Sequence, residues 1–219
     1  MDKYKKLAAN TVIFAISKFS SSVLSFLLMP YVTAKLVSSD YSTADLIQQT
    51  ANVLIPIVFL QINSAALRFA LDKDSDKTSV FTVGLRTTIE GFLVFLIFYY
   101  PITLIRLNDT PLGYYAPLIY VFVLVSGTRQ LCQQFVRGCG YVKLYAFDGI
   151  LATATTLLFN LLFLGPFNWG VYGYVIAIIA SDACSIIFLF IGAKLWKNVT
   201  FKRLPSNARK EMLKYSIPM

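Results

Sequence analysis

Histidine is absent from this 219-residue chain, and cysteine and acidic residues are scarce. The spacing of Cys132, Cys139 and Cys184 fits no metal site, and a disulfide within helices on a cytoplasmic face is not expected. With only 11 aspartate and glutamate residues, the loops hold few carboxylates. Membrane-embedded glycosyl- and lipid-transferases usually need histidines or carboxylate clusters at the membrane–water interface, so these absences argue against such an enzyme. No nucleophile motif, metal cluster or phosphate-binding loop is present, and neither a catalytic residue nor a cofactor is predicted.

Long apolar stretches fill the sequence instead, and 57% of the residues are hydrophobic. A hydrocarbon core of about 30 Å takes roughly 20 helical residues to cross. Six stretches are long enough: 9–36, 42–71, 80–105, 115–136, 145–164 and 170–196. They lack the residue-by-residue alternation of barrel strands, and in lipid a helix satisfies its own backbone. The predicted fold class is all-α, a polytopic transmembrane helix bundle over residues 1–196, followed at 197–219 by a basic linker and the start of a seventh helix.

The distribution of the net charge of +9 predicts the orientation of the bundle. Most basic residues lie in the N-terminal tail, in the connections 72–79, 137–144 and 197–214, and at the adjoining helix ends, whereas the opposite side has only Lys35 and Arg106. The positive-inside rule then places the N-terminus and the C-terminal end in the cytoplasm. Because topology explains the basic charge, no nucleic-acid partner is expected. The first stretch is too long for a signal-peptide core and is interrupted by Lys18, so we expect it to remain as a helix.

Polar side chains recur within the apolar stretches at helical spacing. The second stretch places Asp45, Gln49, Asn52 and Asn63 on one face, together with Pro56. The fourth places Gln133 and Arg137 together, with Arg129 one position away. Such stripes either line a shared hydrated cavity or join helices through hydrogen bonds worth about 0.6 kcal/mol each. Pro30 and Pro56 each lack a backbone donor and predict a kink in the first and second helices.

Lys18 and Asp182 are the deepest ionisable residues. With a rise of about 1.5 Å per residue, both lie near mid-membrane at similar depth. We hypothesise that they face the same interior, as a pair or as a cation- or proton-linked site in which Asp182 titrates. The alternative is a structural ion pair with no role in transport.

Four segments resemble the bacterial polysaccharide flippases of the multidrug/oligosaccharidyl-lipid/polysaccharide exporter superfamily. Residues 10–46, NTVIFAISKFSSSVLSFLLMPYVTAKLVSSDYSTADL, resemble the first helix and outer loop of that family. The run RFALD at 68–72 resembles its Arg-aromatic-x-x-acidic ending, and RQLCQQFVRGCGYVKLYA at 129–146 its connection between the fourth and fifth helices. The tail KEMLKYSIPM resembles the run-in to a seventh helix.

The resemblance implies a non-enzymatic flippase that exports lipid-linked oligosaccharide, as in O-antigen and lipopolysaccharide biosynthesis, by alternating access in the bacterial inner membrane. The chain would be the N-terminal, six-helix lobe of a two-lobe transporter, either as a fragment or with a second polypeptide. Its partners would be the substrate, membrane lipids and the C-terminal half. Lys18, Arg68, Arg129 and Arg137 would meet the anionic sugar-diphosphate-lipid, although cytoplasmic topology and headgroup contact explain the three arginines at least as well.

The candidate site consists of cavity residues and one candidate ion-coupling residue, Asp182. The cavity residues are Lys18, Asp45, Gln49, Asn52, Asn63, Arg68, Arg129, Gln133 and Arg137. No metal ligand is predicted. An ion-coupled multidrug exporter of the same superfamily is the alternative, with Asp182 and Asp45 as coupling carboxylates. From other classes, a membrane-embedded transferase and a non-transporting scaffold remain.

Overall fold

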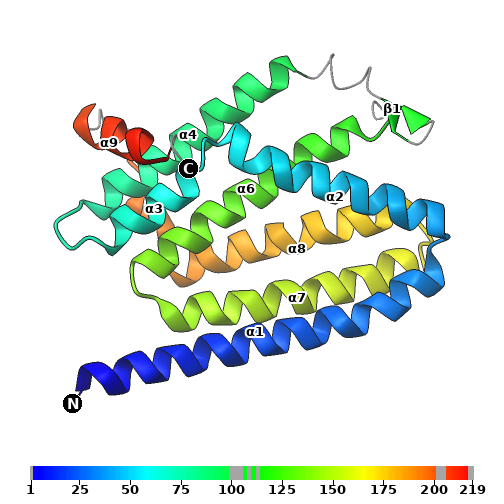
Figure 1. Ribbon diagram of the computed structural model, residues 1–219, viewed down its shortest axis with the longest axis horizontal. Coiled ribbons are helices and arrows are strands. Elements are labelled where there is room, and N and C mark those ends of the chain that lie inside the picture. Colours follow the sequence, from blue (N-terminus) through cyan, green and yellow to red (C-terminus); the bar gives the residue numbers. More distant parts are fainter. Residues whose placement is uncertain (1, 99–105, 108–109, 112–113, 201–205, 217–219) are drawn as a thin grey trace.

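The computed structural model describes residues 2–98, 106–107, 110–111, 114–200 and 206–216, which form an almost entirely helical bundle (Figure 1). The helices are α1 (Asp2–Lys35), α2 (Ser38–Val58), α3 (Ile62–Leu71), α4 (Lys77–Ile97), α6 (Ala116–Gly138), α7 (Val142–Leu164), α8 (Gly170–Gly192), the 3-10 helix η2 (Leu195–Asn198) and α9 (Ser206–Ser216). Two short antiparallel strands, β1 (Arg106–Leu107) and β2 (Thr110–Pro111), lie between α4 and α6.

Length and composition support a polytopic membrane fold. In the described part of the chain, four helical segments are long and apolar enough to cross a membrane: 15–35 of α1, and all of α4, α7 and α8. The bent pair α2–α3 counts as a fifth if it is one span. With 23 residues, α6 is as long as α7 and α8, but it carries Arg129, Arg137 and several amide side chains. The predicted all-α transmembrane bundle is confirmed, and α6, despite these polar side chains, packs inside it against α2, α3, α4, α7 and α8.

The second predicted helix, 42–71, is wrong as a single element because it divides into α2 and α3. The two helices meet at an angle of 59°. Leu60 and Gln61 have φ values of 50° and 52°, in the left-handed region, which interrupts the helix a few residues after Pro56. The first helix, in contrast, continues through Pro30 to Lys35. Pro30 therefore does not end its helix, whereas the break after Pro56 coincides with two residues in the left-handed region.

Two glycines allow neighbouring helices to pack against this break. A Cβ at Gly91 of α4 would lie 2.2 Å from the carbonyl oxygen of Val58, and a Cβ at Gly127 of α6 would lie 1.9 Å from the Phe59 ring. Both distances are far below van der Waals contact, so no larger residue fits without displacing a helix or the ring. The Phe59 ring is completely buried as a result, at the centre of the main core formed by α2, α3, α4, α6 and α8.

The remaining predicted helix ends differ in smaller ways. The third predicted helix extends to 105, but α4 ends at Ile97 and residues 99–105 lie outside the described part. The sixth ends at Gly192 and not at 196, because Lys194 has a φ of 50° and η2 follows. The segment 197–219 contains α9, of which the structure describes Ser206–Ser216.

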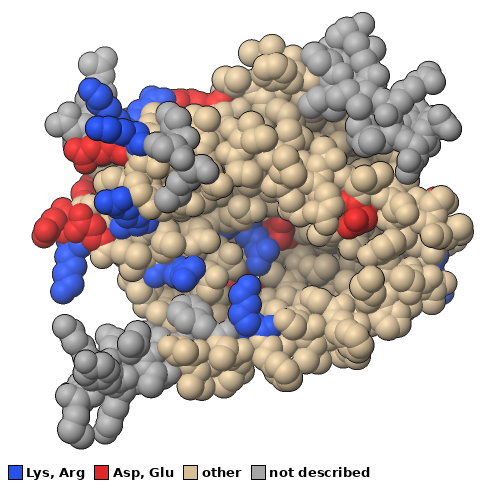
Figure 2. Space-filling view, viewed as in Figure 1, with Lys and Arg blue, Asp and Glu red and all other residues tan. Residues whose placement is uncertain are grey.

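α1 stands apart from the main core. It packs mainly along α7 and touches α2 only near the turn between them. Its outer face exposes large apolar side chains, with Phe19 72% and Phe26 76% exposed, as expected for a helix facing lipid. Basic and acidic side chains gather at the end of the molecule that holds α9, α3 and the loop after α3, here called the basic end (Figure 2). The candidate site lies on the side of the bundle between α1 and the main core.

Candidate functional site

A buried ionic network joins α6, α7 and α8. The guanidinium of Arg129 lies with Nη1 2.9 Å from Asp182 Oδ1 and Nη2 3.5 Å from Asp148 Oδ2. Its Nε donates a hydrogen bond of 2.8 Å to Ser185 Oγ. The side chain of Asp148 is 0% exposed and that of Asp182 8%, so both carboxylates depend on these partners for charge compensation.

Neutral side chains complete the network around both carboxylates. The hydroxyl of Ser126 donates to Asp182 Oδ2, and that of Ser185 donates to Asp148 Oδ1. Gln133 Nε2 donates to Asp148 Oδ2 over 3.0 Å. Every oxygen of the two carboxylates therefore has a partner, as buried charged groups require. With both aspartates ionised, the network has two negative charges and one positive charge.

Arg129 also faces a cavity of about 510 Å³, here called the cationic cavity. Its lining comes from α1, α6 and α7 and consists of Ser17, Lys18, Ser21, Arg129, Gln133, Arg137, Tyr145, Gly149 and Thr153. Three of these side chains are cationic and none is acidic. Figure 2 shows blue and red groups in a hollow near the middle of this face, apart from the charged groups at the basic end.

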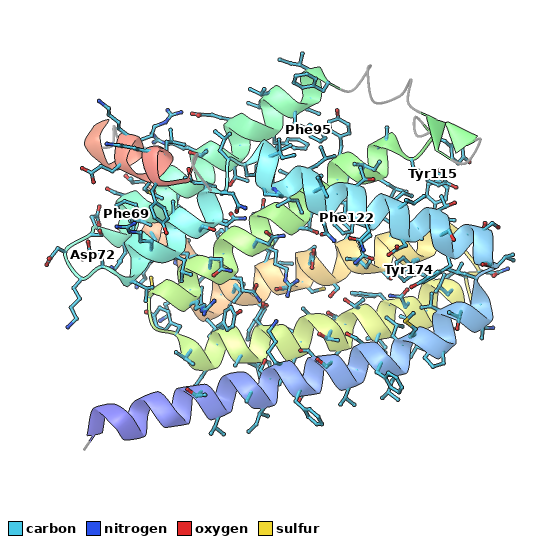
Figure 3. All side chains as sticks on the ribbon, in the orientation of Figure 1. Phe69, Asp72, Phe95, Tyr115, Phe122 and Tyr174 are labelled. Atoms are coloured by element: carbon cyan, nitrogen blue, oxygen red, sulfur yellow. The ribbon has the colours of Figure 1, made fainter. Side chains whose placement is uncertain are left out.

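A second cavity of about 370 Å³ adjoins the first and is here called the aromatic cavity. It shares Arg129 and Thr153 with the cationic cavity, so the two are neighbours. Its other lining residues are Ser25, Leu28, Met29, Val32, Tyr41, Gln48, Ala152, Thr156, Tyr174, Ile178 and Asp182. Tyr174, labelled in Figure 3, lies between α2 and α8.

Small polar groups on α1 hold one wall of these cavities against α7. Ser17 Oγ donates to the Ala146 carbonyl over 2.6 Å, and Ser21 Oγ donates to the Gly149 carbonyl over 3.1 Å. Further along α1, Tyr31 Oη donates to the Leu161 carbonyl over 3.2 Å. These three hydrogen bonds hold α1 against α7. They leave Lys18 and Ser25 of α1 facing the cavities.

The structure brings four of the predicted cavity residues together. Lys18, Arg129, Gln133 and Arg137 all line the cationic cavity, although they come from two helices far apart in the sequence. Asp182 lines the adjoining cavity, where it contacts Arg129. The hypothesised pairing of Lys18 with Asp182 is wrong: in the described part of the chain, the ion pair of Asp182 is with Arg129. Equal depth in the membrane does not place Lys18 and Asp182 side by side.

The other predicted residues lie elsewhere. On α2, Gln49 donates to Asp45 over 3.4 Å and Asn52 is exposed. Asn63 is buried and donates to Gln130 of α6 over 3.3 Å, which makes it a helix-joining group. The guanidinium of Arg68 lies 4.3 Å above the Tyr215 ring of α9, at the basic end. None of these five is among the residues that line the two cavities.

Sequence reasoning missed several residues of the site. Asp148 stands out in the sequence only as part of a loose polar alignment, although a carboxylate in an apolar helix is itself a signal. The tyrosines Tyr41 and Tyr174 carry no comparable signal, because an aromatic residue in a membrane helix is common. Gln48 is an amide beside the polar face of the second stretch, but it is not among the predicted cavity residues. Within the described residues, no group of three or more His, Cys, Asp or Glu side chains is placed to hold a metal ion.

Neither a protein-family model nor a curated protein sequence matches this chain. Solved structures of similar fold include an outward-facing multidrug resistance MATE family transporter of the MOP superfamily, with a TM-score of 0.63 and 12% identity. A MOP superfamily transporter from Pyrococcus furiosus, described as having a binding pocket of reverse polarity, gives 0.64 and 14%. The crystal structure of a MATE point mutant gives 0.62 and 13%.

These similarities cover 95% of this chain but only 51% or 52% of each transporter. The chain therefore spans about half the length of the solved transporters and has the fold of one half of a MOP superfamily transporter. At this identity the comparison establishes the fold alone.

Proposed function

We propose that this chain is one lobe of a flippase that exports lipid-linked oligosaccharide for cell-surface polysaccharide biosynthesis. The diphosphate of the lipid binds in the cationic cavity, while the lipid tail remains in or near the bilayer. A second half, in the same polypeptide or in another one, supplies the opposite wall. The basic end faces the cytoplasm of a bacterial inner membrane, in keeping with the positive-inside rule.

The single observation that carries this proposal is the charge of the cationic cavity. Lys18, Arg129 and Arg137 line it without a carboxylate among its lining residues. Arginine forms paired, charge-assisted hydrogen bonds with phosphate oxygens, and lysine adds a mobile point charge. Ser17 and Ser21 add hydroxyl groups. A dianionic diphosphate matches this set, whereas an organic cation meets repulsion.

The ionic network around Arg129 lowers the positive potential that this residue adds to the cationic cavity. Arg129 is shared between the cavity and two buried aspartates, so its positive charge is already largely compensated. Lys18 and Arg137 add two further positive charges to the cavity wall, and the guanidinium of Arg137 lies 5.5 Å from the centre of the Tyr145 ring. In this arrangement Lys18 and Arg137 raise the positive potential of the cavity, and Arg129 supplies directed donors.

An ion-coupled multidrug exporter of the same superfamily is the second candidate. The MATE fold of the solved neighbours favours it, and so does the presence of Asp182 beside two tyrosine rings in the aromatic cavity. In that account a cationic drug would displace Arg129 from Asp182. The two candidates differ in the sign of charge that the cavities bind.

Export in cells tests the proposal. A strain that lacks its polysaccharide flippase, supplied with this protein in its native reading frame, should regain surface polysaccharide and show no new ion-dependent dye efflux. Replacing Lys18 and Arg137 together by alanine should abolish the rescue, because the diphosphate loses two of the three positive charges that face it. Lys143→Ala is the matched control, since Lys143 is exposed and lies at the basic end outside both cavities. Dye efflux without rescue would overturn the flippase proposal in favour of the exporter.

A further inference from the structure

The aromatic cavity has a lining unlike that of a lipid-facing groove. Tyr41 of α2 and Tyr174 of α8 form its aromatic wall, with ring centroids 6.4 Å apart and planes inclined by 72°. Tyr174 Oη donates to Gln48 Oε1 over 3.3 Å, which holds the amide beside the rings. Across the cavity, Thr153 and Thr156 of α7 present hydroxyl groups. Aromatic faces and planar polar groups thus line the same space.

The charges in this cavity nearly cancel. Arg129 and Asp182 are its only charged lining residues, and they form an ion pair of 2.9 Å with each other. Thr153 and Thr156 donate their hydroxyl protons to backbone carbonyls of α7, at 2.9 and 2.8 Å, and keep acceptor lone pairs. The amide nitrogen of Gln48 provides donors. The cavity therefore offers several acceptors and donors around apolar rings, with one charge of each sign among its described lining residues.

This combination suits a sugar ring. A pyranose has an apolar face of C–H groups that packs on an aromatic ring, and hydroxyl groups around its edge that both donate and accept. A hydrocarbon chain would offer no acceptor to the amide nitrogen of Gln48 and no donor to the lone pairs of the threonine hydroxyls. We propose that the aromatic cavity binds the glycosyl units of the lipid-linked substrate, next to the diphosphate in the cationic cavity. This inference rests on the proposed function.

The two cavities are also ordered along the bundle. On α1, the cationic cavity takes residues 17, 18 and 21, and the aromatic cavity takes 25, 28, 29 and 32. With a rise of about 1.5 Å per residue, their centres are separated by about 14 Å along the helix. The diphosphate end of the substrate consequently lies nearer the basic end, and the sugars point toward the turn between α1 and α2. Arg129, common to both walls, marks the boundary.

Binding of two lipids to the protein in its native reading frame, purified into nanodiscs together with its second half, tests this inference. One lipid is a polyprenyl diphosphate, and the other is the same lipid carrying a disaccharide. We expect the disaccharide to strengthen binding about tenfold, the effect of roughly 1.4 kcal/mol. Tyr174→Leu should remove this increment and leave the affinity for the sugar-free lipid unchanged, whereas Tyr174→Phe, which retains the ring, should keep most of it.

Tyr114→Leu is the matched control, because Tyr114 is exposed and lies outside both cavities. Equal affinity of the wild-type chain for both lipids would overturn the sugar subsite and leave the flippase proposal standing. Binding of neither lipid would overturn both. An increment that survives Tyr174→Leu and Tyr41→Leu would place the sugars elsewhere. If the leucine variants fail to fold, Gln48→Leu takes their place with the same expected loss.

Discussion

Replacing Arg129 by alanine removes the only cation in contact with Asp148 and Asp182 among the described residues. Two accounts of these contacts predict different losses in the free energy of unfolding. If the contacts of Arg129 were ordinary hydrogen bonds between membrane helices, at about 0.6 kcal/mol each, their loss would amount to about 2 kcal/mol. Removing one partner of a buried ion pair costs about 3–5 kcal/mol, because a buried charge is left uncompensated.

The burial of the carboxylates decides between these values. Asp148 is fully buried and Asp182 nearly so, whereas the Arg129 side chain is 22% exposed toward the cavities. Water in the cavities therefore screens part of the interaction, and we expect the lower part of the ion-pair range, about 3 kcal/mol. Asp182→Asn should cost less, below about 1 kcal/mol, because the amide still accepts a hydrogen bond and the network becomes neutral.

Reversible unfolding of the purified chain in mixed detergent micelles measures both changes. Lys18→Ala is the matched control, since Lys18 lies at the same cavity but has no ion pair among the described residues; it should change the free energy of unfolding by no more than about 0.5 kcal/mol. Combining Arg129→Ala with Asp182→Asn should cost less than the sum of the single changes. A loss of about 2 kcal/mol or less for Arg129→Ala would refute the ionic account of the network.

Three further outcomes follow from the fold. The pKa of Asp76 lies below its ordinary value because the Ser79 hydroxyl and the backbone N–H groups at the start of α4 donate to its carboxylate. Asp76→Ala should therefore lower the free energy of unfolding by about 1 kcal/mol at pH 7, a difference that persists above the unfolded pKa and disappears as the pH falls through the folded one, measured by unfolding at several pH values. Gly91→Ala should destabilise the protein by about 1–3 kcal/mol in the same assay, since its Cβ would meet the carbonyl of Val58. Asn63→Leu should change stability by less than about 1 kcal/mol, because its hydrogen bond to Gln130 is of the weak interhelical kind and its Oδ1 has no partner in the described structure; a larger loss would give Asn63 a role beyond joining helices.

The sequence predicts the class of the fold well because each transmembrane helix satisfies its backbone locally. The long apolar stretches and the distribution of basic residues can be read from the sequence without knowledge of the tertiary contacts. The length and periodicity of the stretches are therefore enough to predict the helices. The break between α2 and α3 is different. It depends on positive φ angles at Leu60 and Gln61 and on the close approach of Gly91 and Gly127 from other helices. Pro56 predicts a kink in this helix, but no local pattern gives the position of the break after Val58 or its angle of 59°.

The candidate site was predictable in its residue types and only partly in its contacts. Lys18, Arg129, Gln133 and Arg137 stand out as polar groups within apolar helices, and the structure brings them to one cavity. The partner of Asp182 was not predictable from depth alone. Depth along the membrane normal leaves the lateral position of each helix open, and α6 brings Arg129, not Lys18, to Asp182.

Direct binding of a polyprenyl diphosphate to the protein in its native reading frame, purified into nanodiscs together with its second half, is the measurement that tests the central claim, with a lipophilic organic cation as the competing ligand. We predict that the wild-type chain binds the diphosphate lipid, that the cation does not displace it, and that replacing Lys18 and Arg137 by alanine weakens binding at least about tenfold. Binding of the cation but not of the diphosphate lipid would contradict the account and identify the cavities as those of a drug exporter.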